Sequence, residues 1–81
     1  MKSYTKKFLD HWNIFEADFI PCGVCYKRAV DIHHIYARSK RKDLLDDPSN
    51  LIPLCRADHE KYGDKKQYID FLLLKLKEYK V

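Results

Sequence analysis

Two adjacent histidines, His33 and His34, close a short β-branched segment, and Asn50 and His59 follow at fixed intervals. Adjacent side chains on a strand point to opposite faces, so one imidazole can bind a metal while its neighbour faces a substrate. Histidine is the commonest metal ligand and the side chain best suited to proton transfer near neutral pH. The pattern favours a single-metal site that cuts phosphodiesters.

The chain has 81 residues, and we expect it to form one domain over residues 1–81. A core of this size supplies little net stability, so an additional staple would help the fold. Three cysteines cannot all pair, which disfavours a disulfide framework. Because the sequence has no apolar run long enough for a signal peptide or a membrane span, we expect a cytoplasmic protein without a membrane partner.

The formal net charge is +4, from 16 Lys and Arg against 12 Asp and Glu. This excess is compatible with a polyanionic partner and equally with an ordinary solvated surface. The positions of the basic residues are more informative, because these residues flank the two adjacent histidines and the region around His59. They are Arg38, Lys40, Arg41 and Lys42 on one side, and Lys61, Lys65 and Lys66 on the other.

Helices are expected at both ends of the chain. Aromatic residues recur at three- and four-residue spacing from Tyr4 to Phe19, which predicts a helix over about residues 3–18 that Pro21 interrupts. Asp64 and Gln67 form a pattern similar to a capping box, which predicts a last helix over about residues 64–80. Its apolar stripe consists of Ile69, Leu72, Leu73, Leu76 and either Tyr79 or Lys80.

Between these helices the pattern predicts a hairpin followed by a further helix. Residues 29–35 carry the β-branched Val30, Ile32 and Ile35 and favour a strand. Residues 51–54, which are apolar and interrupted by Pro53, favour an edge strand that pairs back on it. Residues 36–50 are rich in turn formers and predict a long loop with one local helical turn. A helix should begin near Arg56 and end at Gly63 as a left-handed terminator. The expected fold class is therefore α+β.

This order of strand, loop, strand and helix resembles the HNH endonucleases of the ββα-metal class. The resemblance covers about residues 20–63 and depends on several features that agree. They are a C-x-x-C before the first strand, Asp31-Ile32-His33-His34-Ile35, Asn50-Leu51-Ile52-Pro53-Leu54-Cys55, and His59 four residues after that cysteine. It implies a ββα-metal motif flanked by an N-terminal and a C-terminal helix.

The resemblance also implies roles for individual residues. His34 matches the general base that deprotonates the attacking water, His33 and His59 match the ligands of one catalytic divalent cation, and Asn50 matches the residue that holds the loop. The implied reaction is hydrolysis of DNA that leaves 5′-phosphate and 3′-hydroxyl ends. Asp31 lies on the same strand face as His33 and can hydrogen-bond a ligand imidazole, although an exposed carboxylate without a role is the alternative.

The identity of the catalytic cation stays open among Mg²⁺, Mn²⁺, Ni²⁺ and Zn²⁺. Imidazole suits the transition metals better than Mg²⁺, which prefers oxygen ligands. We therefore expect Mn²⁺ or Ni²⁺ to support activity at least as well as Mg²⁺.

Many HNH proteins carry a structural zinc bound by two C-x-x-C pairs. Cys22, Cys25 and Cys55 are present here, but Asp58 stands at the fourth position. A Cys₃Asp zinc site is chemically sound although rarer than Cys₄. The alternative is that zinc has been lost and the cysteines are small buried hydrophobic residues.

The expected partner is double-stranded DNA, bound through phosphate contacts that do not read sequence. The predicted contacts come from basic residues near the site, namely Arg38, Lys40, Arg41, Lys42, Arg56 and Lys61, with Arg56 ranked first for the scissile phosphate. A homodimer, or association with a larger phage or DNA-processing complex, would fit a small enzyme of phage or bacterial type.

Two other functions stay open. The first is a non-catalytic, zinc-stabilised nucleic-acid-binding module, which would tolerate loss of His34. The second is an interaction protein whose aromatic N-terminal stripe and leucine-rich C-terminal stripe form a partner surface, although such stripes more often make the core of a small chain.

Overall fold

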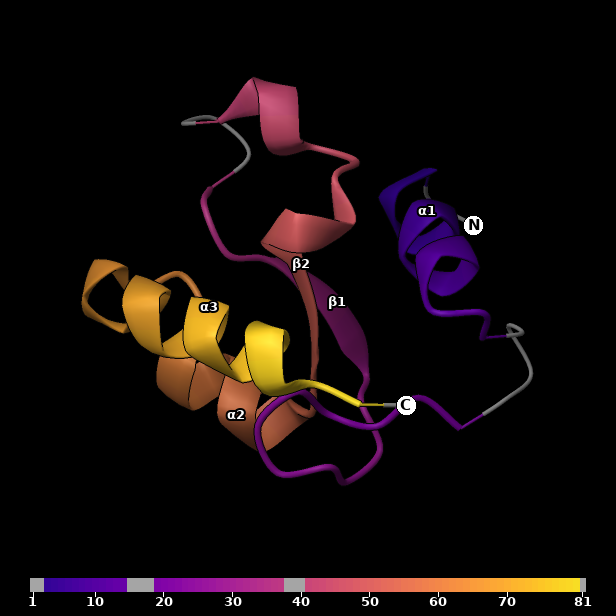
Figure 1. Cartoon of the computed structure of the whole chain (residues 1–81). Helices are drawn as coiled ribbons and strands as arrows, with labels where there is room; N and C mark the ends of the chain where they lie inside the picture. The colour runs from indigo at the N-terminus through magenta and orange to yellow at the C-terminus, as the bar shows by residue number, and fades with distance from the viewer. Residues whose placement is uncertain (1–2, 15–18, 38–40, 81) are drawn as a thin grey trace.

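A computed structural model describes residues 3–14, 19–37 and 41–80. Its elements are three α-helices, two strands and three short 3₁₀ turns, shown in Figure 1. In chain order they are α1 (Ser3–His11), β1 (Asp31–His34), η1 (Lys42–Leu44), η2 (Pro48–Asn50), β2 (Leu51–Leu54), α2 (Arg56–Tyr62), η3 (Lys66–Tyr68) and α3 (Ile69–Glu78). The expected α+β class with a ββα motif between flanking helices is confirmed.

The centre of the fold is the antiparallel pair β1 and β2. Asp31 lies opposite Leu54 and His34 lies opposite Leu51, so the doublet is registered against the most buried strand of the molecule. Pro53 has no N–H to donate and sits in a two-stranded sheet where every strand is an edge. The predicted pairing of an edge strand back on the first strand is therefore confirmed.

Two hydrophobic clusters meet at this hairpin. One joins β2 to α3 through Ile52, Leu54, Leu72 and Leu76, and the other joins α1 to the start of β2. Figure 1 shows α1 on one side of the hairpin and α2 with α3 on the other. The apolar stripes of both terminal helices thus form core, and the hairpin is held from two sides.

The first helix is shorter than the predicted range of residues 3–18. It ends at His11, because Asn13 adopts a left-handed backbone with φ of 54°. The N–H of Asn13 donates to the carbonyl of Asp10, and the N–H of Ile14 donates to that of Leu9, which is the Schellman arrangement that closes a helix. Phe15 lies outside the described residues, and Phe19 is exposed beyond the helix.

The junction before the last helix also differs from the prediction. Gly63 has an ordinary φ of −70°, and the left-handed residue is Asp64, with φ of 57°. Neither η3 nor α3 has a side-chain cap, so the expected capping box is wrong. The last α-helix spans Ile69–Glu78 rather than 64–80.

None of the helices in the described ranges is long and apolar enough to cross a membrane.

Candidate active site and metal centre

The imidazole of His34 is held in one tautomer by the loop between the strands. Its Nε2 lies 2.9 Å from the carbonyl oxygen of Leu45. A carbonyl oxygen can only accept a hydrogen bond, so Nε2 must carry the proton and Nδ1 is left with a free lone pair. The ring of Tyr4 from α1 packs edge-on against it at 4.5 Å between centroids. The result is a buried imidazole in a fixed orientation.

His33 is buried on the opposite face of β1 and faces α2. Its Nε2 accepts a long hydrogen bond of 3.5 Å from the backbone N–H of Asp64, so this nitrogen is unprotonated. Burial lowers the pKa of His33 and outweighs the nearby Asp64 carboxylate, which acts in the opposite direction. The imidazole is therefore held in the neutral form, and its one lone pair, at Nε2, would bind a cation in exchange for the bond from Asp64.

His59 on α2 completes an imidazole pair with His33, and their ring centroids are 5.1 Å apart. The Nδ1 of His59 lies 3.2 Å from Oδ2 of Asp31, the contact with an imidazole that the sequence had suggested for this carboxylate. With this carboxylate beside Nδ1, the other ring nitrogen, Nε2, is the one available as a ligand atom.

The imidazole pair suits an open cation site. Within the described ranges, no third Cys, His, Asp or Glu atom joins His33 and His59 in a compact group. Two nitrogen ligands leave most coordination positions for water and for phosphate oxygens, as a hydrolytic centre needs. The residues present therefore fit a catalytic divalent cation.

Asn50 is buried, with 1 % of its surface exposed, at the start of β2. Its Oδ1 accepts from the N–H of Tyr36 at 2.8 Å, and its Nδ2 donates to the carbonyl of Tyr36 at 3.2 Å. The backbone N–H of Ile35 also donates to the carbonyl of Asn50. One side chain thus fixes the chain directly after the histidine doublet.

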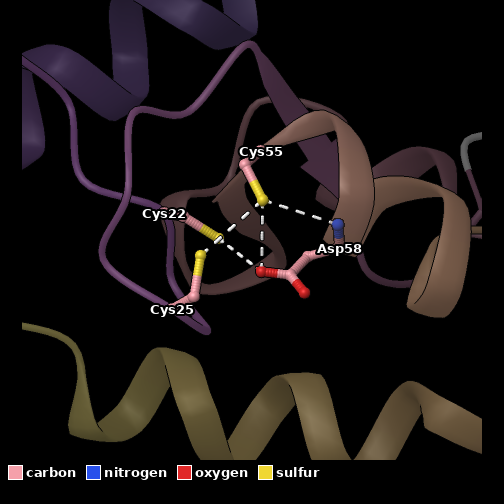
Figure 2. A group of neighbouring side chains, drawn as sticks. All are labelled: Cys22, Cys25, Cys55 and Asp58. Atoms are coloured by element: carbon pink, nitrogen blue, oxygen red, sulfur yellow. Dashed lines mark hydrogen bonds between the residues drawn. The ribbon is translucent and has the colours of Figure 1, made fainter.

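A second ligand group lies at the other end of the hairpin. Cys22 and Cys25 come from the turn before β1, and Cys55 and Asp58 come from the start of α2 (Figure 2). One ligand atom from each residue lies within 4.8 Å of every other. Figure 2 shows all four side chains pointing toward a common centre. We call these four residues the thiol cluster.

The spacing within the thiol cluster suits zinc. A tetrahedral ion with Zn–S bonds of about 2.3 Å places two sulfurs about 3.7 Å apart, and the sulfurs of Cys25 and Cys55 are 3.7 Å apart. Oδ2 of Asp58 is 3.2 Å from the sulfur of Cys22 and 3.3 Å from that of Cys55. The carboxylate therefore stands where a fourth ligand is needed.

The charge on Asp58 also fits a cation site. Burial would raise the pKa of Asp58, but hydrogen bonds from the neighbouring thiols outweigh it and lower the pKa. The sulfur of Cys55 accepts from the backbone N–H of Asp58 and so caps α2. A ligand that starts the helix connects this cluster directly to the element that carries His59.

The basic residues are spread around the site rather than gathered in it. Arg41 makes a bidentate ion pair with Asp43, with N–O distances of 3.1 and 3.0 Å. Its guanidinium lies 5.6 Å from the ring centre of Tyr36. Lys42, Arg56 and Lys61 are exposed. Arg38 and Lys40 lie outside the described residues.

Sequence reasoning missed the groups that orient the imidazoles. These are Tyr4 and the Leu45 carbonyl at His34, the Asp64 amide at His33, and the Tyr36 backbone at Asn50. Each contact is made between segments distant in sequence, and most involve main-chain atoms. Residue types alone carry no signal for such contacts.

Comparison with known families agrees with this geometry. The family model for HNH endonucleases matches residues 22–65, more than half of the chain, and this span contains the imidazole pair, His34, Asn50 and the thiol cluster. No curated protein and no solved structure is similar enough to match. The chain belongs to the HNH endonuclease family.

Proposed function

We propose that this protein is a metal-dependent endonuclease that hydrolyses DNA with His34 as the general base. The observation that carries the proposal is the hydrogen bond from Nε2 of His34 to the Leu45 carbonyl, which leaves Nδ1 free to accept a proton. Membership of the HNH family supports nuclease chemistry and a nucleic-acid substrate.

The chain supplies a distinct function at each position. His33 and His59 would hold the cation, which neutralises charge on the scissile phosphate when bound. His34 takes the proton from the attacking water, a step for which histidine is well suited near neutral pH and which needs no second ion. Attack at phosphorus then releases the 3′ oxygen, so the products are 5′-phosphate and 3′-hydroxyl ends.

Asn50 contributes to this chemistry by position. It fixes the backbone of Tyr36, two residues after His34, and so limits how far the strand end can move. Asp31 acts through His59, whose Nδ1 it contacts at 3.2 Å. Arg41, Lys42, Arg56 and Lys61 are proposed to contact phosphates, and we extend this assignment to Arg38 and Lys40.

The thiol cluster is proposed to hold a structural zinc ion. The 3.7 Å separation of the Cys25 and Cys55 sulfurs, together with the ionised Asp58 beside them, supports this assignment. The cation would fasten the turn before β1 to the first turn of α2.

Nicking of supercoiled plasmid tests the proposed reaction. Loss of a general base typically costs 10²–10⁴ in rate, so His34→Ala should nick at least about 100-fold more slowly than the wild type. The matched control is His11→Ala, which removes an exposed imidazole from the end of α1. The His11→Ala variant should nick at the rate of the wild type. EDTA should stop nicking by the wild type and by His11→Ala.

The same assay separates the alternatives. Equal traces from the wild type, from His34→Ala and from the EDTA samples would favour a non-catalytic nucleic-acid-binding module. Mn²⁺ or Ni²⁺ should support nicking at least as well as Mg²⁺, and strict dependence on Mg²⁺ would argue against His33 and His59 as the ligand pair.

A further inference from the structure

A cleft of about 500 Å³ opens beside His33, between the chain that follows β1 and the segment that leads into α3. Its volume lies in the range typical of sites for small organic groups, about 300–1,000 Å³. Aromatic and aliphatic side chains form much of its wall, and cationic side chains join them. The residues that matter here are His33, Tyr36, Tyr62, Leu72, Arg41 and Lys66. The cleft therefore reaches His33, one member of the imidazole pair.

The aromatic wall of the cleft is held in place before any ligand arrives. Both main-chain groups of Tyr36 are bonded to the side chain of Asn50. The ring of Tyr62 packs against Phe71 at 4.8 Å and against Tyr68 at 4.9 Å between centroids. A rigid aromatic surface can stack a planar group without first losing conformational freedom.

The charge at the cleft favours an anionic ligand. Among the described lining residues, Arg41, Lys65 and Lys66 are cationic and Asp64 is anionic, and Arg41 is paired with Asp43. Lys65 and Lys66 therefore keep the cleft positively charged. The ammonium of Lys65 is itself fixed by the carbonyls of Glu60 and Lys61 at the end of α2. An apolar, aromatic interior with a cationic wall matches a nucleobase attached to its phosphate.

We propose that the cleft receives one unpaired nucleobase of the DNA strand that is held at the imidazole pair. This inference rests on the proposed function, because the phosphate beside His33 would belong to the cleavage position. A base inside a regular duplex is stacked and paired on both sides, so it must leave the helix before it can enter a cleft of this kind. The favoured substrate is DNA with an unpaired nucleotide next to the scissile bond.

A binding experiment that needs no cleavage tests the proposal. The full-length His34→Ala protein is titrated, with anisotropy as readout, against three labelled duplexes that differ at one central position. One is fully paired, one has a single bulged adenosine, and one has a bulged abasic nucleotide with the same backbone. Stacking of one base predicts about tenfold or greater preference for the bulged adenosine over the abasic duplex.

Variants then assign the preference to the cleft. In the His34→Ala background, Tyr36→Leu should abolish it and Tyr36→Phe should retain it. The matched control is Phe19→Leu, which removes an aromatic ring that is 52 % exposed and does not line the cleft. Lys66→Glu should weaken binding of all three duplexes, and it provides a test on an exposed residue if Tyr36→Leu does not fold.

Two results would overturn the proposal. One is equal affinity for the bulged adenosine and the abasic duplex, and the other is a preference that survives Tyr36→Leu in folded protein. Cleavage of the bulged-adenosine duplex by the wild type is scored separately, because a fully paired plasmid lacks the favoured substrate. Cleavage without a bulge preference rejects the cleft alone, and a bulge preference without cleavage rejects hydrolysis alone.

Discussion

At the scale of single residues, main-chain atoms decide what the histidines can do. The carbonyl of Leu45 sets the tautomer of His34, and the N–H of Asp64 faces the lone pair of His33. Both partners are backbone groups whose position depends on loop conformation. For this reason residue types indicated which imidazoles matter, while the nitrogen that each would use became visible only in the structure.

Asn50→Ala should destabilise the protein. The substitution leaves the N–H and the carbonyl of Tyr36 without their partners, and a buried polar group left unsatisfied costs about 1–3 kcal/mol. Urea unfolding measures the loss. The control is Ser49→Ala, one residue away and exposed, which should stay within about 0.5 kcal/mol of the wild type. Equal unfolding midpoints for both variants would contradict the bracing role of Asn50.

At the scale of elements, the hairpin and α2 were predictable and the helix ends around them were not. Alternation of β-branched residues and the turn-rich segment before Asn50 are local signals, and they predicted both strands. The aromatic spacing continues past the end of α1, so it predicted a helix that was too long. The spacing of apolar residues gives no information on the left-handed backbone of Asn13, which ends the helix. Asp64 was misread for the same reason, since its backbone turns toward His33 instead of capping a helix.

Gly63 has a different role from the one predicted. Its φ is open to any residue, but a Cβ there would collide with the ring Cδ2 and the carbonyl of His59 and lie 3.2 Å from Nε2. Glycine is therefore required for space beside the imidazole. Because residue 63 has no side chain, the backbone at the end of α2 can pack directly against the imidazole of His59.

Gly63→Ala should therefore cost stability and slow nicking. Overpacking typically costs about 1–3 kcal/mol, which exceeds the gain of about 0.4–1 kcal/mol from the lower conformational entropy of the unfolded chain. Urea unfolding and plasmid nicking are measured together. The control is Ala57→Gly, an exposed change on the same helix that should lose about 1 kcal/mol or less without a change in nicking rate. A more stable Gly63→Ala protein with wild-type nicking would contradict the close contact.

At the scale of the whole molecule, two small clusters and one short hairpin must hold 81 residues. The thiol cluster joins segments 30 or more positions apart in sequence, because Cys22 contacts Asp58 and Cys25 contacts Cys55. A cation bound there would supply the stabilising cross-link that we expected from the small size of the chain.

Removal of zinc should unfold or strongly destabilise the protein. Structural zinc contributes about 10–16 kcal/mol of apparent binding free energy in small domains, comparable to the whole stability of about 5–15 kcal/mol. Elemental analysis should find about one zinc per chain, and Cys22→Ser should lose it together with cooperative thermal unfolding. Asp58→Cys should bind zinc more tightly and resist chelators longer. A cooperative transition that chelators do not shift, in protein without zinc, would contradict the assignment.

The first turn of α2 carries Cys55, Asp58 and His59, so two sites of different chemistry share a few ångströms of rigid backbone. If both ions bind as proposed, the thiol cluster would hold zinc tightly, whereas the imidazole side would have to admit and release its cation. A cell short of zinc would then lose DNA cleavage even where the catalytic ion is plentiful. On the proposed function, zinc supply would therefore limit the nuclease activity of this chain.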